Sequence, residues 1–448
     1  MSQVTRILAA WYQMGQDSGY PTPGVGMPAN FEASHQIVNA RSPASVDTLL
    51  QGAIEGHVLV KNVNNALPLK NPTMLSIFGY DAKVPDQYDV GSAWTNGREP
   101  DVGYTGQFAG NGTIVSGGGS GAVTPPYISS PFDAILQQAI NDGTALFWDF
   151  DTVNSTSNVD AASTACLVFI NAWATEGADR TGLHDSFSDN LVINIASQCS
   201  NTIVIIHNAG IRLVDQWIEN LNVTAVIFAH LLGQDSGRAL VQLLYGEVSP
   251  SGKLPYTIAM NESDYGPLLA PSQAEGEFAL FPQSNFSEGV FIDYRRFDVM
   301  NITPRFEFGF GLSYTTFSYS SLSAQASSFK PSVYPTGDII PGGASDLWDT
   351  VARVTAVVRN AGSVTAAEVP QLYIGIPTQG QPVKQLRGFD KLTLKPGQSQ
   401  VVTFELMRRD LSVWDTVVQK WALQKGSYNI YVGSSSRDSP LTGSLSLY

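Results

Sequence analysis

The sequence predicts a fold of the α/β class, in which an α/β sandwich domain built on a parallel sheet precedes a β-sandwich domain. Between residues 43 and 262, short continuous apolar runs alternate with segments of helical periodicity. After Pro304 the pattern changes to short strands of alternating apolar and polar residues separated by turns. The chain of 448 residues also exceeds the roughly 250 to 300 residues that one hydrophobic core fills, so two domains are expected.

Residues 1–42 precede the α/β pattern. Residues 4–19 place Ile7, Leu8 and Trp11 on roughly one helical face and end at glycine, which predicts a short helix. Residues 20–30 are rich in proline and glycine, and proline disfavours helix before it. We interpret 1–42 as a remnant helix and linker from another domain.

The α/β domain is predicted to span residues 43–262. Residues 46–62 predict a helix that ends in the sequence VLVKN. Continuous apolar runs, which suit strands buried on both faces, occur at 74–79, 165–171, 202–207 and 223–228. The apolar spacing of helices occurs at 185–197, 212–220 and 234–245. This alternation predicts a parallel sheet covered on both sides.

The β-sandwich is predicted at 311–448, after a connecting segment at 263–310. Its clearest strands are expected at 351–358, 369–376, 401–406 and 428–432. Lys395-Pro396-Gly397-Gln398 predicts a turn between two of them. Regular short strands without intervening helices indicate a sandwich of the fibronectin type III kind.

Composition excludes several classes of function. A formal net charge of −14 repels phosphate and anionic lipid, so nucleic acid and membrane surfaces are poor partners. No run of about 18 apolar residues could span a bilayer. The glycine run at 117–121 lacks the Lys-Ser/Thr of a phosphate loop, so no nucleotide is expected. We expect no metal and no cofactor, because ligand spacing is lacking among the histidines, which are His35, His57, His184, His207 and His230.

The density of glycosylation acceptors points to secretion. N-x-S/T sites occur at Asn111, Asn154, Asn222, Asn261, Asn285 and Asn301. Residues 1–8 lack the features of a signal peptide, so we expect an extracellular parent protein whose signal lies upstream of Met1. Cys166 and Cys199 are compatible with one disulfide, and two buried thiols are the alternative.

The segment 171–183 directly follows a predicted buried strand, where open α/β sheets place their ligands. Glu176 could protonate a leaving group there, or it could be an ordinary exposed acid beside a structural Asp179–Arg180 ion pair. Trp173 could stack on a sugar ring at the entrance or pack in the core.

Short motifs follow one another in a fixed order between Lys61 and Phe389. They are Lys61-Asn62 with Ala66-Leu67-Pro68-Leu69, Glu176-Gly177-Ala178-Asp179-Arg180, Gly233-Gln234-Asp235-Ser236-Gly237, Gly246 with Ser249-Pro250-Ser251-Gly252-Lys253-Leu254-Pro255, Glu288-Gly289-Val290-Phe291-Ile292-Asp293-Tyr294-Arg295, Phe306-Glu307-Phe308-Gly309-Phe310-Gly311-Leu312-Ser313-Tyr314 and Leu386-Arg387-Gly388-Phe389. Each is weak alone, but their order over more than 300 residues makes chance agreement improbable. Together they resemble glycoside hydrolase family 3, and most nearly its fungal-type β-glucosidases.

The resemblance implies a (β/α)8 barrel with an aspartate nucleophile, an α/β sandwich that donates the acid/base glutamate from a loop, and a fibronectin-like domain. Only the last two parts have matches here, and the residues before Pro43 are too few for a barrel of about 250 residues. The barrel is therefore expected to be missing, and it is the implied intramolecular partner. By this resemblance Glu176, the only glutamate of its loop, is the acid/base. Asp179 and Arg180 are implied to hold the loop or to contact sugar.

The function implied by the resemblance is that of part of a retaining β-glucosidase, which removes terminal β-D-glucosyl residues from cellobiose and other glucosides during cellulose and polysaccharide breakdown. Its partners would be such glucosides or oligosaccharides. Without a nucleophile the chain by itself is expected to be inactive. The alternative is a non-catalytic remnant that binds carbohydrate or a partner.

Overall fold

The computed structural model describes residues 3–20, 41–86, 107–123, 125–153, 158–176, 180–269, 275–283, 286–328 and 330–447. The chain forms two compact units, Met1–Leu49 and Leu50–Tyr448. The first contains the expected short helix as α1 (Gln3–Gln13), none of whose residues is buried.

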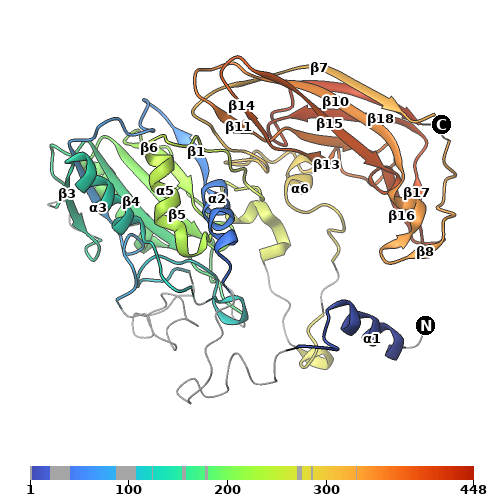
Figure 1. Cartoon of the computed structure of the whole chain (residues 1–448), viewed down its shortest axis with the longest axis horizontal. Coiled ribbons are helices and arrows are strands. Elements are labelled where there is room, and N and C mark those ends of the chain that lie inside the picture. Colours follow the sequence, from blue (N-terminus) through green and yellow to red (C-terminus); the bar gives the residue numbers. More distant parts are fainter. Residues whose placement is uncertain are drawn as a thin grey trace. The chain divides into compact units, whose positions relative to one another are not determined.

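A six-stranded sheet lies at the centre of the α/β domain (Figure 1). Its strands are β1 (Val58–Asn62), β2 (Met74–Phe78), β3 (Ala145–Asp149), β4 (Ala165–Ala172), β5 (Thr202–Asn208) and β6 (Val223–Phe228). The order is β1-β6-β5-β4-β2-β3, and all neighbours are parallel except β1, which pairs antiparallel with β6. Each of the four predicted strands is therefore confirmed, in a sheet that is mainly parallel.

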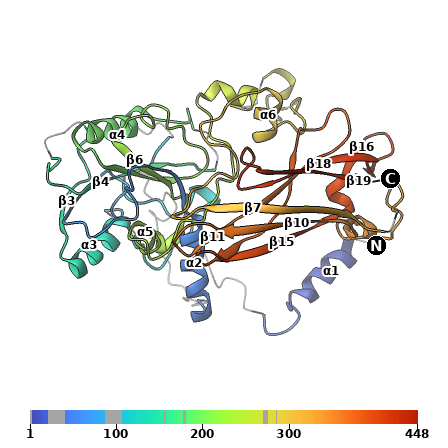
Figure 2. The same ribbon diagram turned by 90° about the horizontal axis from the view of Figure 1, so that it is seen from above.

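Helices α3 (Pro131–Asp142), α4 (Ser186–Gln198) and α5 (Ser236–Leu244) cover the two faces of this sheet, and Ile54 of α2 (Val46–Gly56) packs with Leu243 of α5. Figure 2 shows α4 on one face and α3 and α5 on the other. Alternate residues of β4 supply the two cores: Val168 packs with α4 and Phe169 with α3 and α5. The side chain of Asp185 caps α4 by accepting a hydrogen bond from the Ser188 amide at 2.7 Å.

Two local predictions for this domain are wrong. The VLVKN segment is strand β1 and not the end of a helix, because α2 ends at Gly56 and three successive apolar side chains are then buried in the sheet. Residues 212–220 form turns instead of a helix. Their apolar spacing does bury Val214, Trp217 and Ile218. The segment makes a single bond of α-helical spacing, from the Ile218 amide to the Val214 carbonyl, and the other backbone bonds within it, Trp217 to Val214 and Asn220 to Trp217, have the shorter spacing of turns.

The C-terminal part is an antiparallel β-sandwich, as predicted. One sheet has the order β15-β10-β7 and the other β13-β12-β18-β19. Their bounds are β7 (Phe317–Ala326), β10 (Thr350–Asn360), β12 (Gln371–Gly375), β13 (Gln385–Phe389), β15 (Ser399–Met407), β18 (Gly426–Gly433) and β19 (Leu441–Leu447). Val354, Ile374 and Ile430 are fully buried in the core that the two sheets share. The expected turn is present, since the Gln398 amide donates to the Lys395 carbonyl at 2.9 Å.

Smaller elements make up the rest of the secondary structure in the described ranges. They are β8 (Ile339–Ile340), β9 (Gly343–Ala344), β11 (Ala366–Glu368), β14 (Leu392–Leu394), β16 (Ser412–Asp415), β17 (Lys420–Leu423), α6 (Tyr294–Val299) and short 3-10 helices at Pro43–Ser45, Gly119–Gly121, Gly233–Asp235, Glu262–Leu269, Gly276–Phe278, Ser345–Trp348 and Arg408–Leu411. Polar contacts join the α/β domain and the connecting segment after it to the sandwich within the larger unit. Lys253 and Glu368 form an ion pair at 3.2 Å, and the Leu386 amide donates to the Tyr294 hydroxyl of α6 at 2.9 Å.

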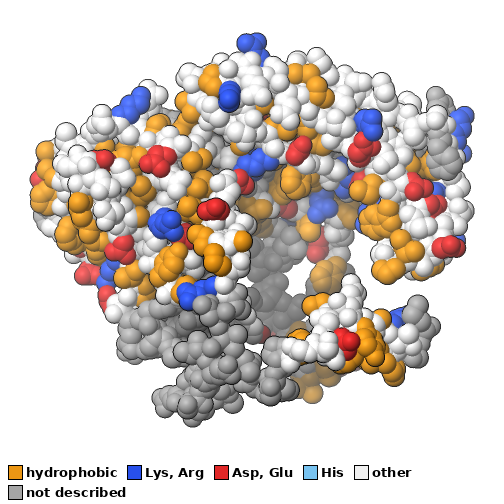
Figure 3. Space-filling model, in the orientation of Figure 1, with side chains coloured by type: hydrophobic (Ala, Val, Ile, Leu, Met, Phe, Trp, Pro, Cys, Tyr) orange, Lys and Arg blue, Asp and Glu red, His pale blue; other side chains and the backbone are white. Residues whose placement is uncertain are grey.

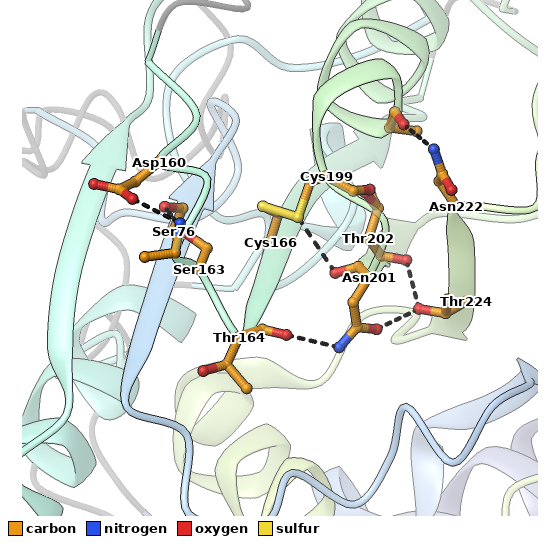
Figure 4. The surroundings of a disulfide bond; sticks show 12 residues. Ser76, Asp160, Ser163, Thr164, Cys166, Cys199, Asn201, Thr202, Asn222 and Thr224 are labelled. Atoms are coloured by element: carbon orange, nitrogen blue, oxygen red, sulfur yellow. Dashed lines mark hydrogen bonds between the residues drawn. A yellow bond between two sulfur atoms is a disulfide. The ribbon is translucent and has the colours of Figure 1, made fainter.

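Cys166 and Cys199 form a disulfide, one of the two alternatives that the sequence left open. It ties β4 to the residue that follows α4 (Figure 4). Hydrogen bonds hold the surrounding backbone: the Asn201 side chain donates to the Thr164 carbonyl at 2.9 Å, and the Thr202 hydroxyl donates to the Cys199 carbonyl at 2.8 Å.

The surface agrees with the sparse charge of the sequence. On the face that Figure 3 shows, basic and acidic side chains are scattered among neutral ones and form no large basic patch. Among the described residues, no helix is long and apolar enough to cross a membrane.

Four of the glycosylation acceptors can be placed. Asn261 and Asn301 are exposed, whereas Asn111 and Asn222 are half-buried. The Asn222 side-chain amide donates to the Ala196 carbonyl at 2.8 Å. Asn154 and Asn285 lie outside the described residues.

Candidate active site

The candidate site lies just beyond the carboxyl end of β4, where the chain continues through Trp173 to Glu176. The Glu176 side chain is exposed, and its Oε2 accepts a hydrogen bond from the Ser120 amide at 2.8 Å. Two loops distant in sequence therefore meet at this carboxylate. A second bond joins them, from the Gly118 amide to the Ala174 carbonyl at 3.0 Å.

Glycine is required where these loops meet. Gly119 has φ +69°, and a Cβ atom there would lie 2.5 Å from Cβ of Glu176. A Cβ atom on Gly118 would lie 2.4 Å from the Trp173 ring. The glycine run at 117–121 therefore permits close approach to the Glu176 loop, which explains a composition that superficially resembles a phosphate loop.

The electrostatic environment of Glu176 favours the ionised carboxylate. Hydrogen bonds from Ser120 hold the pKa of Glu176 below its ordinary value, and burial contributes little because the side chain is exposed. A carboxylate in this state can accept a proton, but a general acid needs a raised pKa.

Trp173 is 1% exposed and packs with Ala109, Ile114 and Leu231. Its backbone amide also donates to the Gln107 carbonyl at 3.0 Å. Of the two roles considered from the sequence, this burial supports packing, because stacking on a sugar ring needs an exposed face. The side chain supports the base of the Glu176 loop.

Arg180 lies farther along the same loop and is half-buried. Its Nη1 donates to the Ile211 carbonyl at 2.8 Å, and burial lowers the pKa of its guanidinium. This contact joins the loop to the segment after β5 and suits a loop-holding role. Asp179 lies outside the described residues, so the suggested Asp179–Arg180 pair stays a prediction.

A buried polar network beneath the loops was not predicted from the sequence. Asp81 Oδ2 accepts a hydrogen bond from His207 Nδ1 at 2.5 Å, and His207 Nε2 lies 2.7 Å from the Ser236 hydroxyl. Asn171 Nδ2 donates to Asp81 Oδ1 at 2.9 Å. All four side chains are fully buried. Burial raises the pKa of Asp81, while hydrogen bonds from His207, Asn171 and the Ile114 amide act against that rise.

A signal for part of this network was present in the sequence. Asp81 follows β2, Asn171 lies near the end of β4, and His207 near the end of β5. Because β2, β4 and β5 are parallel neighbours, their carboxyl ends meet at one edge of the sheet. Ser236 begins α5, and no spacing rule connects it to the other three. Across the part of the chain that the structure describes, no group of three or more His, Cys, Asp or Glu side chains could hold a metal ion.

Comparisons with known proteins agree with this architecture. Residues 57–314 match the model of the glycosyl hydrolase family 3 C-terminal domain, and residues 368–436 match that of a fibronectin type III-like domain. The chain is 56% identical over 444 residues to a probable beta-glucosidase M of Aspergillus niger, and 52% identical over 462 residues to the beta-glucosidase cel3A of Pyricularia oryzae. The alignments cover 99% and 100% of this chain but only 56% and 58% of those relatives.

Solved structures show the same relationship. The beta-D-glucoside glucohydrolase of Trichoderma reesei superimposes with a TM-score of 0.85 at 42% identity, covering 99% of this chain and 60% of that one. The beta-glucosidase D2-BGL of Chaetomella raphigera gives a TM-score of 0.88 at 41% identity, with the same coverages. The match to the family model covers more than half of the chain, and the chain therefore belongs to glycosyl hydrolase family 3.

Proposed function

We propose that this chain is part of a retaining β-glucosidase and that Glu176 is the acid/base of that enzyme. The observation that carries the proposal is the position of Glu176, which is exposed beyond the carboxyl end of β4 on a loop fixed by Ser120 and Trp173. The names of the relatives, which are beta-glucosidases, supply the substrate class. The proposed substrates are cellobiose and other β-glucosides.

Retaining hydrolysis needs two carboxyl groups about 5 to 5.5 Å apart, one that attacks the anomeric carbon and one that protonates the leaving oxygen. In the proposed mechanism Glu176 gives its proton to the departing oxygen and then, as a carboxylate, takes a proton from the water that releases glucose. The attacking aspartate would come from the barrel that the family resemblance implies. Covering the loop with that barrel would bury Glu176 and place a second carboxylate beside it, and both effects raise the pKa of a carboxyl group.

The 448-residue chain by itself is proposed to be inactive. General-acid help contributes about 10² to 10⁴-fold, whereas enzymes supply roughly 10⁶-fold or more over the uncatalysed rate. Hydrolysis of an aryl β-glucoside by purified chain, at a rate abolished by Glu176→Ala, would show that a nucleophile lies within these residues.

The acid/base role is tested by Glu176→Ala in the full-length protein. The variant should lose about 10² to 10⁴-fold in kcat/KM on cellobiose and other glucosides with alcohol leaving groups, which need protonation. Activated aryl glucosides, whose phenolates leave unprotonated, should lose much less in their glycosylation step. Azide should restore turnover, because it attacks the glycosyl-enzyme without a general base.

A matched control is Glu247→Ala, which removes another exposed carboxylate of the same domain, after α5. It should leave both substrate classes unchanged. Equal losses of Glu176→Ala on both classes, with no azide rescue, would exclude Glu176 from the role.

We further propose that the parent protein is secreted and glycosylated. The exposed acceptors Asn261 and Asn301 support this proposal, because an acceptor asparagine must be accessible. Extracellular action would also suit a role in cellulose breakdown, since cellobiose is released outside the cell.

A further inference from the structure

We propose that Asp81, Asn171 and His207 are positioning residues for Glu176. They form the buried network at the carboxyl ends of β2, β4 and β5. The inference rests on the proposed acid/base role of Glu176 and adds the means by which the domain holds that carboxylate in place.

The network has the connectivity of a hydrolase triad but cannot act as one. A Ser–His–Asp triad needs a serine hydroxyl that reaches the substrate, with the histidine between serine and aspartate. Here the order Ser236–His207–Asp81 is present, yet the exposed fraction of each residue is 0%. Because Ser236 begins helix α5 beneath the loops, no substrate reaches its hydroxyl in this fold. We therefore assign a structural role, and not a catalytic one, to the Ser236–His207–Asp81 arrangement.

His207 fixes the direction of the Asp81 carboxylate. A carboxylate only accepts hydrogen bonds, so His207 Nδ1 donates to Asp81, while Nε2 on the other side of the ring lies 2.7 Å from the Ser236 hydroxyl. One oxygen of Asp81 is thereby occupied by His207. The other oxygen, Oδ1, is directed to Asn171 Nδ2 at 2.9 Å and to the Ile114 amide at 3.2 Å.

Asn171 and Asp81 in turn fix the loop that contacts Glu176. The Asn171 side chain holds Ala109 from both sides, accepting from its amide at 2.9 Å and donating to its carbonyl at 2.8 Å. The loop is thus bound at Ala109 through Asn171 and at Ile114 through Asp81. Six residues beyond Ile114, the Ser120 amide donates to Glu176 at 2.8 Å.

The loop that carries Glu176 is also anchored to this buried network, through β4 and Trp173. Asn171 lies in β4, only five residues before Glu176 in the chain. Between them Trp173 packs against Ala109 and Ile114, the two residues that the polar network holds. Both segments that meet at the carboxylate are therefore anchored to one rigid group, and loss of that group should shift them together.

The test measures leaving-group dependence in the full-length protein carrying Asn171→Leu or Asp81→Asn. A misplacement of about 1 Å can cost roughly 10²-fold in rate. We expect kcat/KM on cellobiose to fall by about 10 to 100-fold through kcat, while the glycosylation rate on a dinitrophenyl glucoside falls by less than about threefold. Azide should accelerate turnover of the aryl glucoside by both variants, as it should for Glu176→Ala.

Thr202→Val is the matched control. Thr202 is equally buried, at the start of β5, and its hydroxyl donates to the Cys199 carbonyl at 2.8 Å without contacting either loop. The Thr202→Val substitution removes a buried hydrogen bond of the same kind. It should leave the dependence of the hydrolysis rate on the leaving group unchanged. A general loss of stability would affect all three variants alike.

Amide hydrogen exchange of the unmutated protein provides a measurement that needs no variant to fold. The Ala109 and Ile114 amides should exchange far more slowly than exposed loop amides, because buried carbonyl and carboxylate acceptors hold them. Exchange of both amides at loop rates would overturn the proposal.

Equal losses of activity on both substrate classes in Asn171→Leu and Asp81→Asn would also overturn it. If Glu176→Ala shows the leaving-group effect and these variants do not, only the positioning role fails; if Glu176→Ala also lacks it, the proposed function fails with it.

Discussion

Opening the Cys166–Cys199 disulfide should destabilise the α/β domain by about 4 kcal/mol. The bond closes a loop with a sequence separation of 33, which contains most of β4 and all of α4. For a loop of that length the chain-entropy relation gives a loss of roughly 12 to 13 cal/mol/K in the unfolded state, or about 4 kcal/mol at 25 °C.

The native state should tolerate loss of the bond. Cys166 is held in register against Thr202 on β5, and the backbone at Cys199 is fixed by bonds from its amide to Ile195 and from Thr202 to its carbonyl. These contacts remain after reduction, so the fold should keep its shape. The stability difference should therefore arise mainly from the greater freedom of the reduced, unfolded chain.

Urea unfolding of oxidised and reduced protein, followed by tryptophan fluorescence, measures this difference. The buried Trp217 reports on the affected domain, since its ring nitrogen donates to Asp189 of α4 at 2.9 Å. A Cys166→Ala/Cys199→Ala variant is the control, because reductant should not move its midpoint. Identical midpoints for oxidised and reduced protein would refute the entropic reasoning, as would a reductant effect that persists in the variant.

Two further predictions concern acid stability and glycosylation. Burial lowers the pKa of His57 to about 3 from 6.5, so the folded protein holds this ring neutral. The unfolded chain binds the proton first as the pH falls below 6.5, and stability should therefore drop progressively between pH 6.5 and 3, by up to about 5 kcal/mol. Urea unfolding at pH 7 and pH 4 should show a smaller pH effect in His57→Gln; an unchanged effect would contradict the assignment. Secreted protein should lose mass on enzymatic deglycosylation, and Asn261→Gln and Asn301→Gln should each remove one glycan, whereas mass spectra without any shift would count against secretion.

In the α/β domain, the strands that the sequence predicts are those buried on both faces. All residues of β4, β5 and β6 are buried, so their composition records the burial directly. The edge strand β3 was missed because Ala145, Phe147 and Trp148 are exposed and its pattern gives neither alternation nor a buried run. The VLVKN segment was assigned to a helix because a short apolar run has no period of its own, and only its pairing with β6 decides its form.

The sequence predicts the location of the candidate site but not the buried polar network beneath it. A loop after a buried parallel strand is a general location for function, and that rule predicts the loop 171–183, whereas the resemblance to glycoside hydrolase family 3 implies the role of Glu176 within it. The supporting network joins residues far apart in sequence, with Asp81 and His207 separated by 126 positions. No local pattern encodes such a pairing. Trp173 shows the same limit, because an aromatic residue beside a candidate acid has the same sequence appearance whether it faces solvent or the core.

The ionised state of Glu176 distinguishes the contribution of the α/β domain from the contribution that a covering domain would have to make. Ser120 lowers the pKa of the exposed carboxyl, so this domain alone holds Glu176 in place but keeps it ionised. Loss of water and a nearby negative charge both raise the pKa of a carboxyl group, and in the proposed enzyme the covering domain would supply both. In the proposed mechanism, position and acidity would be supplied by different domains, so the acid would form only in the assembled enzyme. Variants of Asn171 should accordingly change the placement of Glu176 while leaving its pKa to the covering domain. The alkaline limb of the pH–rate profile, where a general acid loses its proton, should then stay where it is in the unmutated enzyme.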